Sequence, residues 1–114
     1  MRTRTLHVTL DTTLTPPVSV VEGDLSVGKH RYQITWLPAE GQSGWTFTKI
    51  TQADQSSALP DPPFSGVTVS DGQITLQDDN KHGLDHGRFS YSIQVKSGDH
   101  YYWSDPEIIN KGGN

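Results

Sequence analysis

Side chains able to hold a hard cation gather in the polar stretch from residue 78 to residue 87. Asp78, Asn80 and Gly83 follow the order Asp-x-Asn-x-x-Gly, which opens a calcium-binding loop whose oxygen ligands at alternate positions converge on the ion. Asp85 adds another carboxylate, but the position where such a loop needs a bidentate Glu holds a phenylalanine. We therefore interpret the stretch as a solvated turn between strands and keep Asp78, Asn80 and Asp85 as candidate ligands only.

Histidine spacing offers a second metal hypothesis. His82 and His86 are four residues apart, the spacing of two ligands on one helix face, although nothing around them predicts a helix. His100, from a neighbouring turn, would be needed to complete a zinc site, and exposed loop histidines are the alternative interpretation. The sequence contains no cysteine, which excludes disulfides, thiol catalysis and cysteine-bound zinc or iron–sulfur centres. We expect no bound metal and no cofactor.

Residues used in catalysis are present, but they form no recognisable motif. The ten Asp and three Glu are scattered over turns, whereas acid–base catalysis needs two carboxylates facing each other across a cleft. No nucleophile elbow, phosphate-binding glycine loop or zinc-protease motif occurs. We expect a protein without catalytic activity, and an unrecognised hydrolase is kept as the last alternative.

Aromatic residues give the remaining signal for a binding surface. Trp36, Trp45, Tyr101 and Trp103 occupy the apolar phase of their predicted strands, which favours packing in the core. Tyr102 is out of phase and is expected to face solvent. With Tyr101 and Trp103 it forms the candidate interaction surface, for stacking on a sugar or for contact with another subunit. If all three tryptophans are buried, only Tyr102 remains for stacking and an interaction module is favoured.

The elements that must position these residues are strands. The 12 Thr, 8 Val and 6 Ile far outnumber the 3 Ala, and β-branched residues favour strands over helices. Glycine and proline are spread along the chain and separate short segments in which apolar and polar residues alternate. This pattern predicts an all-β fold with strands in these ranges: 6–10, 18–21, 32–36, 45–48, 67–69, 74–76, 89–95 and 101–103.

Connections and core follow from the same pattern. We expect a hairpin between the strands at 32–36 and 45–48, and a second one around Asp71-Gly72, because Asp-Gly is a strong hairpin signal. The polar, proline-rich segment 51–63 is expected to be irregular and to cross between sheets. The predicted core consists of the in-phase residues Leu6, Val8, Ile34, Trp45, Ile74, Phe89, Tyr91, Ile93 and Trp103.

One segment resembles a signature of immunoglobulin domains. Residues 85–91, Asp-His-Gly-Arg-Phe-Ser-Tyr, resemble Asp-x-Gly-x-Tyr-x-Cys, with Phe89 at the corner tyrosine and Tyr91 at the second cysteine. Ile34 would take the place of the first cysteine and Trp45 that of the buried tryptophan. The resemblance implies an immunoglobulin-like β-sandwich. The spacing of the predicted strands, about 8 to 12 residues, predicts seven or eight antiparallel strands, and the length predicts one domain over residues 1–114. Phe89 lacks the hydroxyl that makes the corner hydrogen bond in that family.

The C-terminal run is similar to the ending of another family. Residues 101–110, Tyr-Tyr-Trp-Ser-Asp-Pro-Glu-Ile-Ile-Asn, resemble small uncharacterised bacterial proteins of the DP-EP family, with Asp105-Pro106 as the diagnostic pair. This resemblance implies an immunoglobulin-like fold in a family without an assigned activity.

Charge and hydropathy limit the partners. The net charge is −4 and no run of Lys or Arg occurs, which argues against nucleic acid and anionic membranes. No apolar segment has membrane-spanning length or follows the start as a signal peptide would, so we expect a cytoplasmic protein. The first hypothesis is a non-catalytic protein-interaction module or homodimer that uses a sheet edge, since the first strand has few edge charges beyond Arg2 and Arg4. A small-ligand or carbohydrate-binding domain is the alternative.

Overall fold

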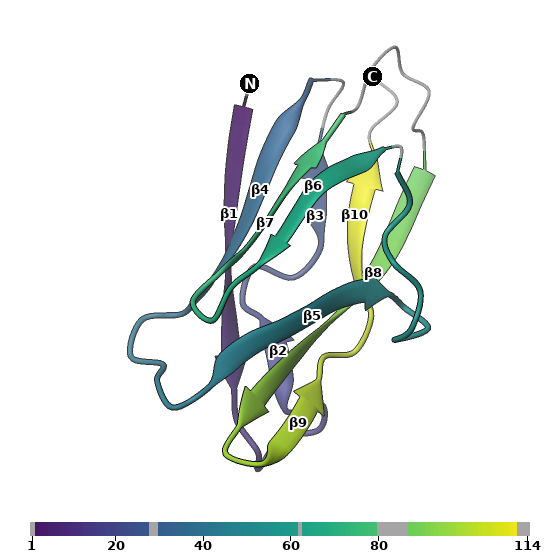
Figure 1. Ribbon diagram of the computed structural model, residues 1–114. Coiled ribbons are helices and arrows are strands. Elements are labelled where there is room, and N and C mark those ends of the chain that lie inside the picture. Colours follow the sequence, from purple (N-terminus) through teal and green to yellow (C-terminus); the bar gives the residue numbers. More distant parts are fainter. Residues whose placement is uncertain (1, 28–29, 62, 80–86, 112–114) are drawn as a thin grey trace.

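Every regular element that the structure describes is a β-strand (Figure 1). The structure is a computed structural model that describes residues 2–27, 30–61, 63–79 and 87–111. It confirms the predicted all-β class. The strands are β1 (Arg2–Leu10), β2 (Val18–Val20), β3 (Leu25–Val27), β4 (Tyr32–Pro38), β5 (Thr46–Gln52), β6 (Phe64–Val69), β7 (Ile74–Asp78), β8 (Gly87–Ser97), β9 (His100–Trp103) and β10 (Glu107–Lys111).

The strands form two mixed sheets. The first has the order β2-β1-β4-β7-β6, and the second has the order β3-β10-β8-β5, with β9 paired to β8. Strand β1 runs parallel to β4, and β3 runs parallel to β10, whereas the other pairs are antiparallel. The prediction of seven or eight antiparallel strands is therefore inexact. Along the chain, β2 and β3 come between β1 and β4, and this long connection lets β1 and β4 run in the same direction.

The facing sides of the two sheets share one hydrophobic core. Its two largest fully buried side chains are Trp36 of β4 and Tyr91 of β8, whose rings lie edge to face with centroids 5.3 Å apart. The Trp36 Nε1–H donates a hydrogen bond of 3.2 Å to the Tyr91 hydroxyl, so this buried polar pair joins the sheets. The predicted core residues that are buried here are Leu6, Val8, Ile34, Ile74, Tyr91 and Ile93, while Trp45 and Phe89 are only partly buried against them.

Three connections determine which sheet each strand joins. The prediction of a hairpin between β4 and β5 is wrong, because these strands belong to different sheets and residues 39–45 carry the chain across. The hairpin of β6 and β7 around Asp71-Gly72 is confirmed, with Ser70 N–H donating to the Gln73 carbonyl at 2.9 Å. The segment after β5 crosses to the other sheet as predicted, since β5 and β6 lie in different sheets.

The hairpin of β8 and β9 reverses the predicted phase of the C-terminal aromatics. Ser97 pairs with His100 across a two-residue turn, and Val95 therefore pairs with Tyr102. Paired residues share a sheet face, so the turn exchanges odd and even positions between the two strands. Tyr102 packs against the core, and the prediction that it faces solvent is wrong.

Tyr101 and Trp103 consequently lie on the outer face, contrary to their predicted place in the core. Trp103 pairs with Gln94, and Tyr101, which is 54% exposed, pairs with Lys96. The Lys96 ammonium lies 5.4 Å from the centroid of the Tyr101 ring, a cation–π distance. Only Trp36 of the three tryptophans is fully buried, whereas Trp45 and Trp103 are partly exposed. The prediction that stacking would fall to Tyr102 alone required all three to be buried, and it therefore does not apply.

Replacing the Tyr91 hydroxyl tests the contact that joins the sheets. In Tyr91→Phe the buried indole N–H of Trp36 loses its acceptor, which is expected to cost about 1–3 kcal/mol of unfolding free energy. The matched control is Tyr101→Phe at an exposed position, with an expected change within about 0.5 kcal/mol. Urea denaturation measures both. Equal midpoints for Tyr91→Phe and the wild type would contradict the role of this contact.

The same tyrosine predicts a loss of stability at alkaline pH. Burial raises the pKa of Tyr91, while the hydrogen bond from Trp36 opposes that effect. Because the unfolded side chain ionises near pH 10, the stability from the neutral folded side chain is present below that pH and is lost as pH rises above it. Urea midpoints measured between pH 8 and pH 11 are expected to fall less steeply for Tyr91→Phe than for the wild type. Identical slopes would show that Tyr91 does not contribute.

Candidate functional site

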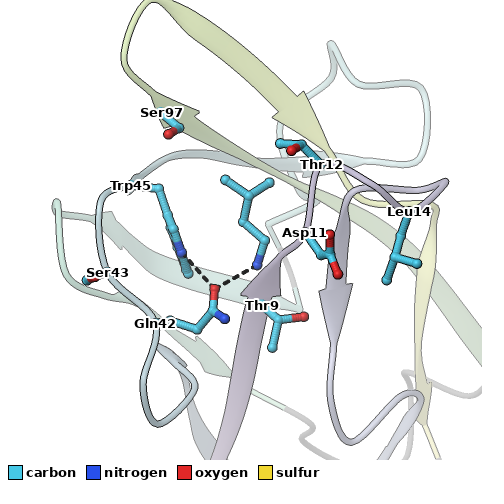
Figure 2. Close-up of a pocket in the computed structure, with 9 residues that line it drawn as sticks. Thr9, Asp11, Thr12, Leu14, Gln42, Ser43, Trp45 and Ser97 are labelled. Atoms are coloured by element: carbon cyan, nitrogen blue, oxygen red, sulfur yellow. Dashed lines mark hydrogen bonds between the residues drawn. The ribbon is translucent and has the colours of Figure 1, made fainter.

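A groove of about 540 Å³ lies at the end of the molecule where β1 finishes and the chain crosses towards β5 (Figure 2). This end is opposite the one where β1 begins (Figure 1). The turn of the β8–β9 hairpin and the segment after β1 also reach it. The groove is lined by Thr9, Leu10, Asp11, Thr12, Leu14, Gln42, Ser43, Trp45 and Ser97.

Strand alternation explains why three of these residues converge. Leu10 is the last residue of β1 and is in phase with the buried Leu6 and Val8. Trp45 directly precedes β5 and is in phase with Phe47, and Ser97 ends β8 in phase with the buried odd-numbered residues of that strand. Side chains two positions apart share a sheet face, so the inner faces of both sheets contribute to this groove.

One side-chain oxygen holds the groove together. Gln42 Oε1 accepts a hydrogen bond of 2.9 Å from the Leu10 backbone N–H and another of 2.9 Å from the Trp45 indole N–H (Figure 2). The Trp45 ring also meets the Phe47 ring edge to face, with centroids 5.1 Å apart and an interplanar angle of 88°. A hydrogen bond and a ring contact thus fix the indole from two directions. The Gln42 Nε2 group makes no hydrogen bond to other described residues and remains a donor.

The opposite wall is the turn that follows β1. Asp11 Oδ1 accepts hydrogen bonds from the Thr13 hydroxyl (2.6 Å) and the Thr13 backbone N–H (3.0 Å), and the Leu14 N–H donates to the Asp11 carbonyl at 3.0 Å. The two bonds from Thr13 lower the pKa of Asp11, the side-chain bond most. The carboxylate is therefore ionised at neutral pH, and Oδ2 makes no hydrogen bond to other described residues. Leu14, 55% exposed, adds an apolar surface beside it.

The lining combines the groups that a polyhydroxylated ligand needs. Trp45 and Leu14 supply apolar surface, Asp11 supplies an ionised acceptor and Gln42 supplies an amide donor. The hydroxyl groups in the lining belong to Thr9, Thr12, Ser43 and Ser97, of which Ser97 Oγ already donates to the Gly44 carbonyl at 3.1 Å. Asp11 is the one carboxylate in the lining and no histidine contributes to it, so the groove lacks the pair of groups used in glycoside hydrolysis. The arrangement is suited to binding.

Of the candidate metal ligands, the structure describes only Asp78 and His100. Asp78 is the last residue of β7, fully buried and in register with Tyr32 and Phe64, rather than part of a solvated turn. Asn80, Asp85, His82 and His86 lie outside the described residues. His100 is exposed at the start of β9. Within the described part of the chain, no group of three His, Asp or Glu side chains could hold a metal ion.

Sequence reasoning missed this groove. It assigned Trp45 to the core and made no functional assignment for Asp11, Leu14 or Gln42. The signal that could have found it is the place of Trp45, a large aromatic at the first inner-face position after a loop, where a core residue can also reach solvent. No periodicity marks the loop residues, because they belong to no strand.

A second hollow of about 260 Å³ lies between the end of β5 and the start of β8 and is less suited to a ligand. Asp54, in its lining, accepts hydrogen bonds from the Ser56 N–H, the Ser57 N–H and the Ser57 hydroxyl. These bonds, that from the Ser57 side chain most, lower the pKa of Asp54 to about 2. Because its carboxylate is already engaged by its own loop, we assign it a structural role.

A comparison with models of known protein families finds no match, and a search among curated proteins finds none either. The described residues include no helix long and apolar enough to cross a membrane. Function is therefore inferred from the groove and the fold that forms it.

The two hydrogen bonds that Gln42 Oε1 accepts predict how the groove responds to substitution. In Gln42→Ala the Leu10 and Trp45 N–H groups both lose their acceptor, with an expected cost of about 1–2 kcal/mol and faster solvent exchange of the Trp45 indole N–H. Gln42→Glu keeps an acceptor oxygen and is expected to preserve slow exchange. NMR exchange rates and urea denaturation measure these effects. Unchanged indole exchange in Gln42→Ala would show that Gln42 does not hold Trp45.

Proposed function

We propose that this chain is a non-catalytic binding module with an immunoglobulin-like β-sandwich fold, and that its groove binds a carbohydrate. The fold part is supported by strand order. From β4 onward, β4, β7 and β6 lie in the sheet that also holds β1, whereas β5, β8 and the interrupted strand β9–β10 lie in the other. This is the division of strands A, B, E and D from C, F and G in constant-type immunoglobulin domains.

The family resemblances fit this fold in part. Ile34 and Tyr91, at the two cysteine positions, are buried in opposing sheets. The tryptophan that packs on Tyr91 is Trp36 on β4, however, and Trp45 lies at the groove instead of filling the core. The Asp105-Pro106 pair of the DP-EP resemblance falls in the break between β9 and β10, where Ser104 holds the chain to β8 by bonding to Ile93. We propose that the chain belongs to that family.

The observation that carries the ligand proposal is the fixed indole of Trp45, which lies where the core opens into the groove. A sugar ring has an apolar face of C–H groups and a rim of hydroxyls, so it needs an aromatic surface beside hydrogen-bonding groups. Trp45 is partly exposed and is held by Gln42 and Phe47 before any ligand arrives. Such preorganisation reduces the entropy lost on binding.

The rest of the groove agrees with a neutral, hydroxyl-rich ligand. Asp11 Oδ2 can accept from a ligand hydroxyl, and Gln42 Nε2 can donate to a ligand oxygen from the opposite side of the groove. The volume of about 540 Å³ falls within the range of about 300–1,000 Å³ of small-molecule sites. A groove with one carboxylate and no cationic side chain in its lining disfavours anionic ligands.

The proposal is tested by titrating the whole protein with a panel of neutral oligosaccharides, using calorimetry. At least one linkage class is expected to bind, and Trp45→Ala is expected to weaken its binding about tenfold or more, because burial of the indole against the sugar is lost. The matched control is Trp103→Ala, which removes a partly buried indole from the outer sheet face and is expected to leave affinity within about twofold. Asp11→Asn keeps the size of the side chain and is expected to weaken binding through the lost charge.

Two results would contradict the carbohydrate proposal. One is the absence of binding across the panel for a wild-type protein that melts cooperatively. The other is binding that Trp45→Ala leaves unchanged, which would place the ligand outside the groove.

A further inference from the structure

The protein-interaction hypothesis gains support from a different place, the outer side of β1. Strand β2 pairs with β1 only from Val8 to Leu10, whereas β4 pairs with β1 from Arg2 to Val8. The side of β1 that faces away from β4 is therefore uncovered by any described strand over residues 2–6. This segment is exposed from Arg2 to Thr5.

The direction of each backbone group on this segment follows from the hydrogen bonds at its ends. Arg2 N–H donates to the Arg31 carbonyl at 3.0 Å and the Val8 carbonyl accepts from Ala39 N–H at 2.9 Å, so even-numbered residues bond towards β4. His7 bonds the other way, its carbonyl accepting from Val21 N–H at 2.8 Å. Backbone groups alternate in direction along a strand, so the N–H and C=O groups of Thr3 and Thr5 point away from β4.

Those outward groups form a short, open pairing site. The Thr3 carbonyl accepts from Arg4 Nη1 at 3.1 Å, an exposed contact that an incoming N–H can replace. The Thr3 N–H and both backbone groups of Thr5 make no hydrogen bond within the described part of the chain. The site ends at His7, whose N–H donates to Glu22 Oε1 at 2.7 Å.

The other sheet edges are protected from strand addition. β2 and β3 have three residues each, and β9, which pairs only with β8, has four. β5 shifts register between Phe47 and Lys49, and β6 does so between Ser65 and Thr68, with Gly66 at a φ of 60°. Short strands and bulges are the devices that prevent edge-to-edge pairing. The segment of β1 has neither.

Charge favours an acidic partner over a second copy of this chain. Arg2 and Arg4 are exposed on one face of the segment, and the Arg4 guanidinium lies 4.9 Å from the centroid of the Tyr32 ring. In a symmetric antiparallel pair of β1 strands that matches Thr3 with Thr5, Arg4 would face the Arg4 of the other copy, a like-charge contact that destabilises the pair. An extended peptide with carboxylates at alternate positions would place opposite charges there instead.

We propose that the outward edge of β1, from Arg2 to Leu6, binds an acidic, extended segment of a partner protein as an added strand of this sheet. The hydrogen bonds come from Thr3 and Thr5, and the two arginines select the charge of the partner. The site is separate from the groove and does not depend on what the groove binds.

The test uses the full chain and a short synthetic peptide in which glutamate and valine alternate, followed by amide chemical shifts in NMR. Binding is expected to shift the Thr3 and Thr5 amides and to weaken with added salt, because both arginines are exposed. The same peptide with lysine in place of glutamate is expected to bind at least about tenfold more weakly.

Substitution of Thr5 separates backbone pairing from charge. Thr5→Pro removes an outward N–H that β4 does not use, and proline is tolerated at such edge positions. It is expected to weaken binding about tenfold or more, whereas Thr5→Val keeps the N–H and binds as the wild type does. If Thr5→Pro fails to fold, N-methylation of the peptide amide that would donate to the Thr5 carbonyl gives the same test, with a methyl group on the neighbouring amide as the control.

Several outcomes would overturn the proposal. Absence of binding by the wild type, equal binding of the lysine peptide, or equal binding by Thr5→Pro would each do so. Sedimentation that shows a dimer lost in Thr5→Pro would assign the edge to a second copy of this chain instead.

Discussion

The two sheets bury their facing sides in one core. In each strand, the apolar residues must therefore occupy the alternate positions that face this core. Trp36 and Tyr91, the two largest fully buried side chains, join the sheets by a hydrogen bond and an edge-to-face ring contact. Followed outward along β1 and β8, the same alternation ends at Leu10 and Ser97. The groove thus continues the core and is not an addition to its surface.

Gln42 fixes the position of two of the residues that line the groove, Leu10 and Trp45. It lies on the connection between the sheets, and its one carbonyl oxygen bonds the end of β1 in one sheet and Trp45, beside β5, in the other. Because both bonds use the same oxygen, the spacing of the two strand ends and the orientation of the indole are coupled. The crossing connection that replaces the expected hairpin is what brings Gln42 to this position.

Local patterns could be predicted from the sequence because they depend on neighbouring residues. Alternation predicted every described strand except β3 and β10, and the burial of Leu6, Val8 and Ile34. The Asp71-Gly72 pair predicted the hairpin of β6 and β7. The sheet to which β5 belongs could not be predicted, since period-two alternation is the same in either sheet. The phase of Tyr101 to Trp103 depended on the length of one turn, and a two-residue turn reversed it. Asp11 follows β1 and Gln42 lies on the crossing from β4 to β5, so only the fold places both in one groove, and no spacing in the sequence records it.

In the proposed complex the indole of Trp45 contacts the ligand where the core opens into the groove. The most direct measurement is a two-dimensional NMR spectrum of the three tryptophan indole N–H groups during a titration with the oligosaccharide class that binds. We expect the Trp45 signal to shift progressively while the buried Trp36 signal stays in place. A titration that shifts only the Trp103 signal, or that shifts none of the three while binding is detected by calorimetry, would contradict it.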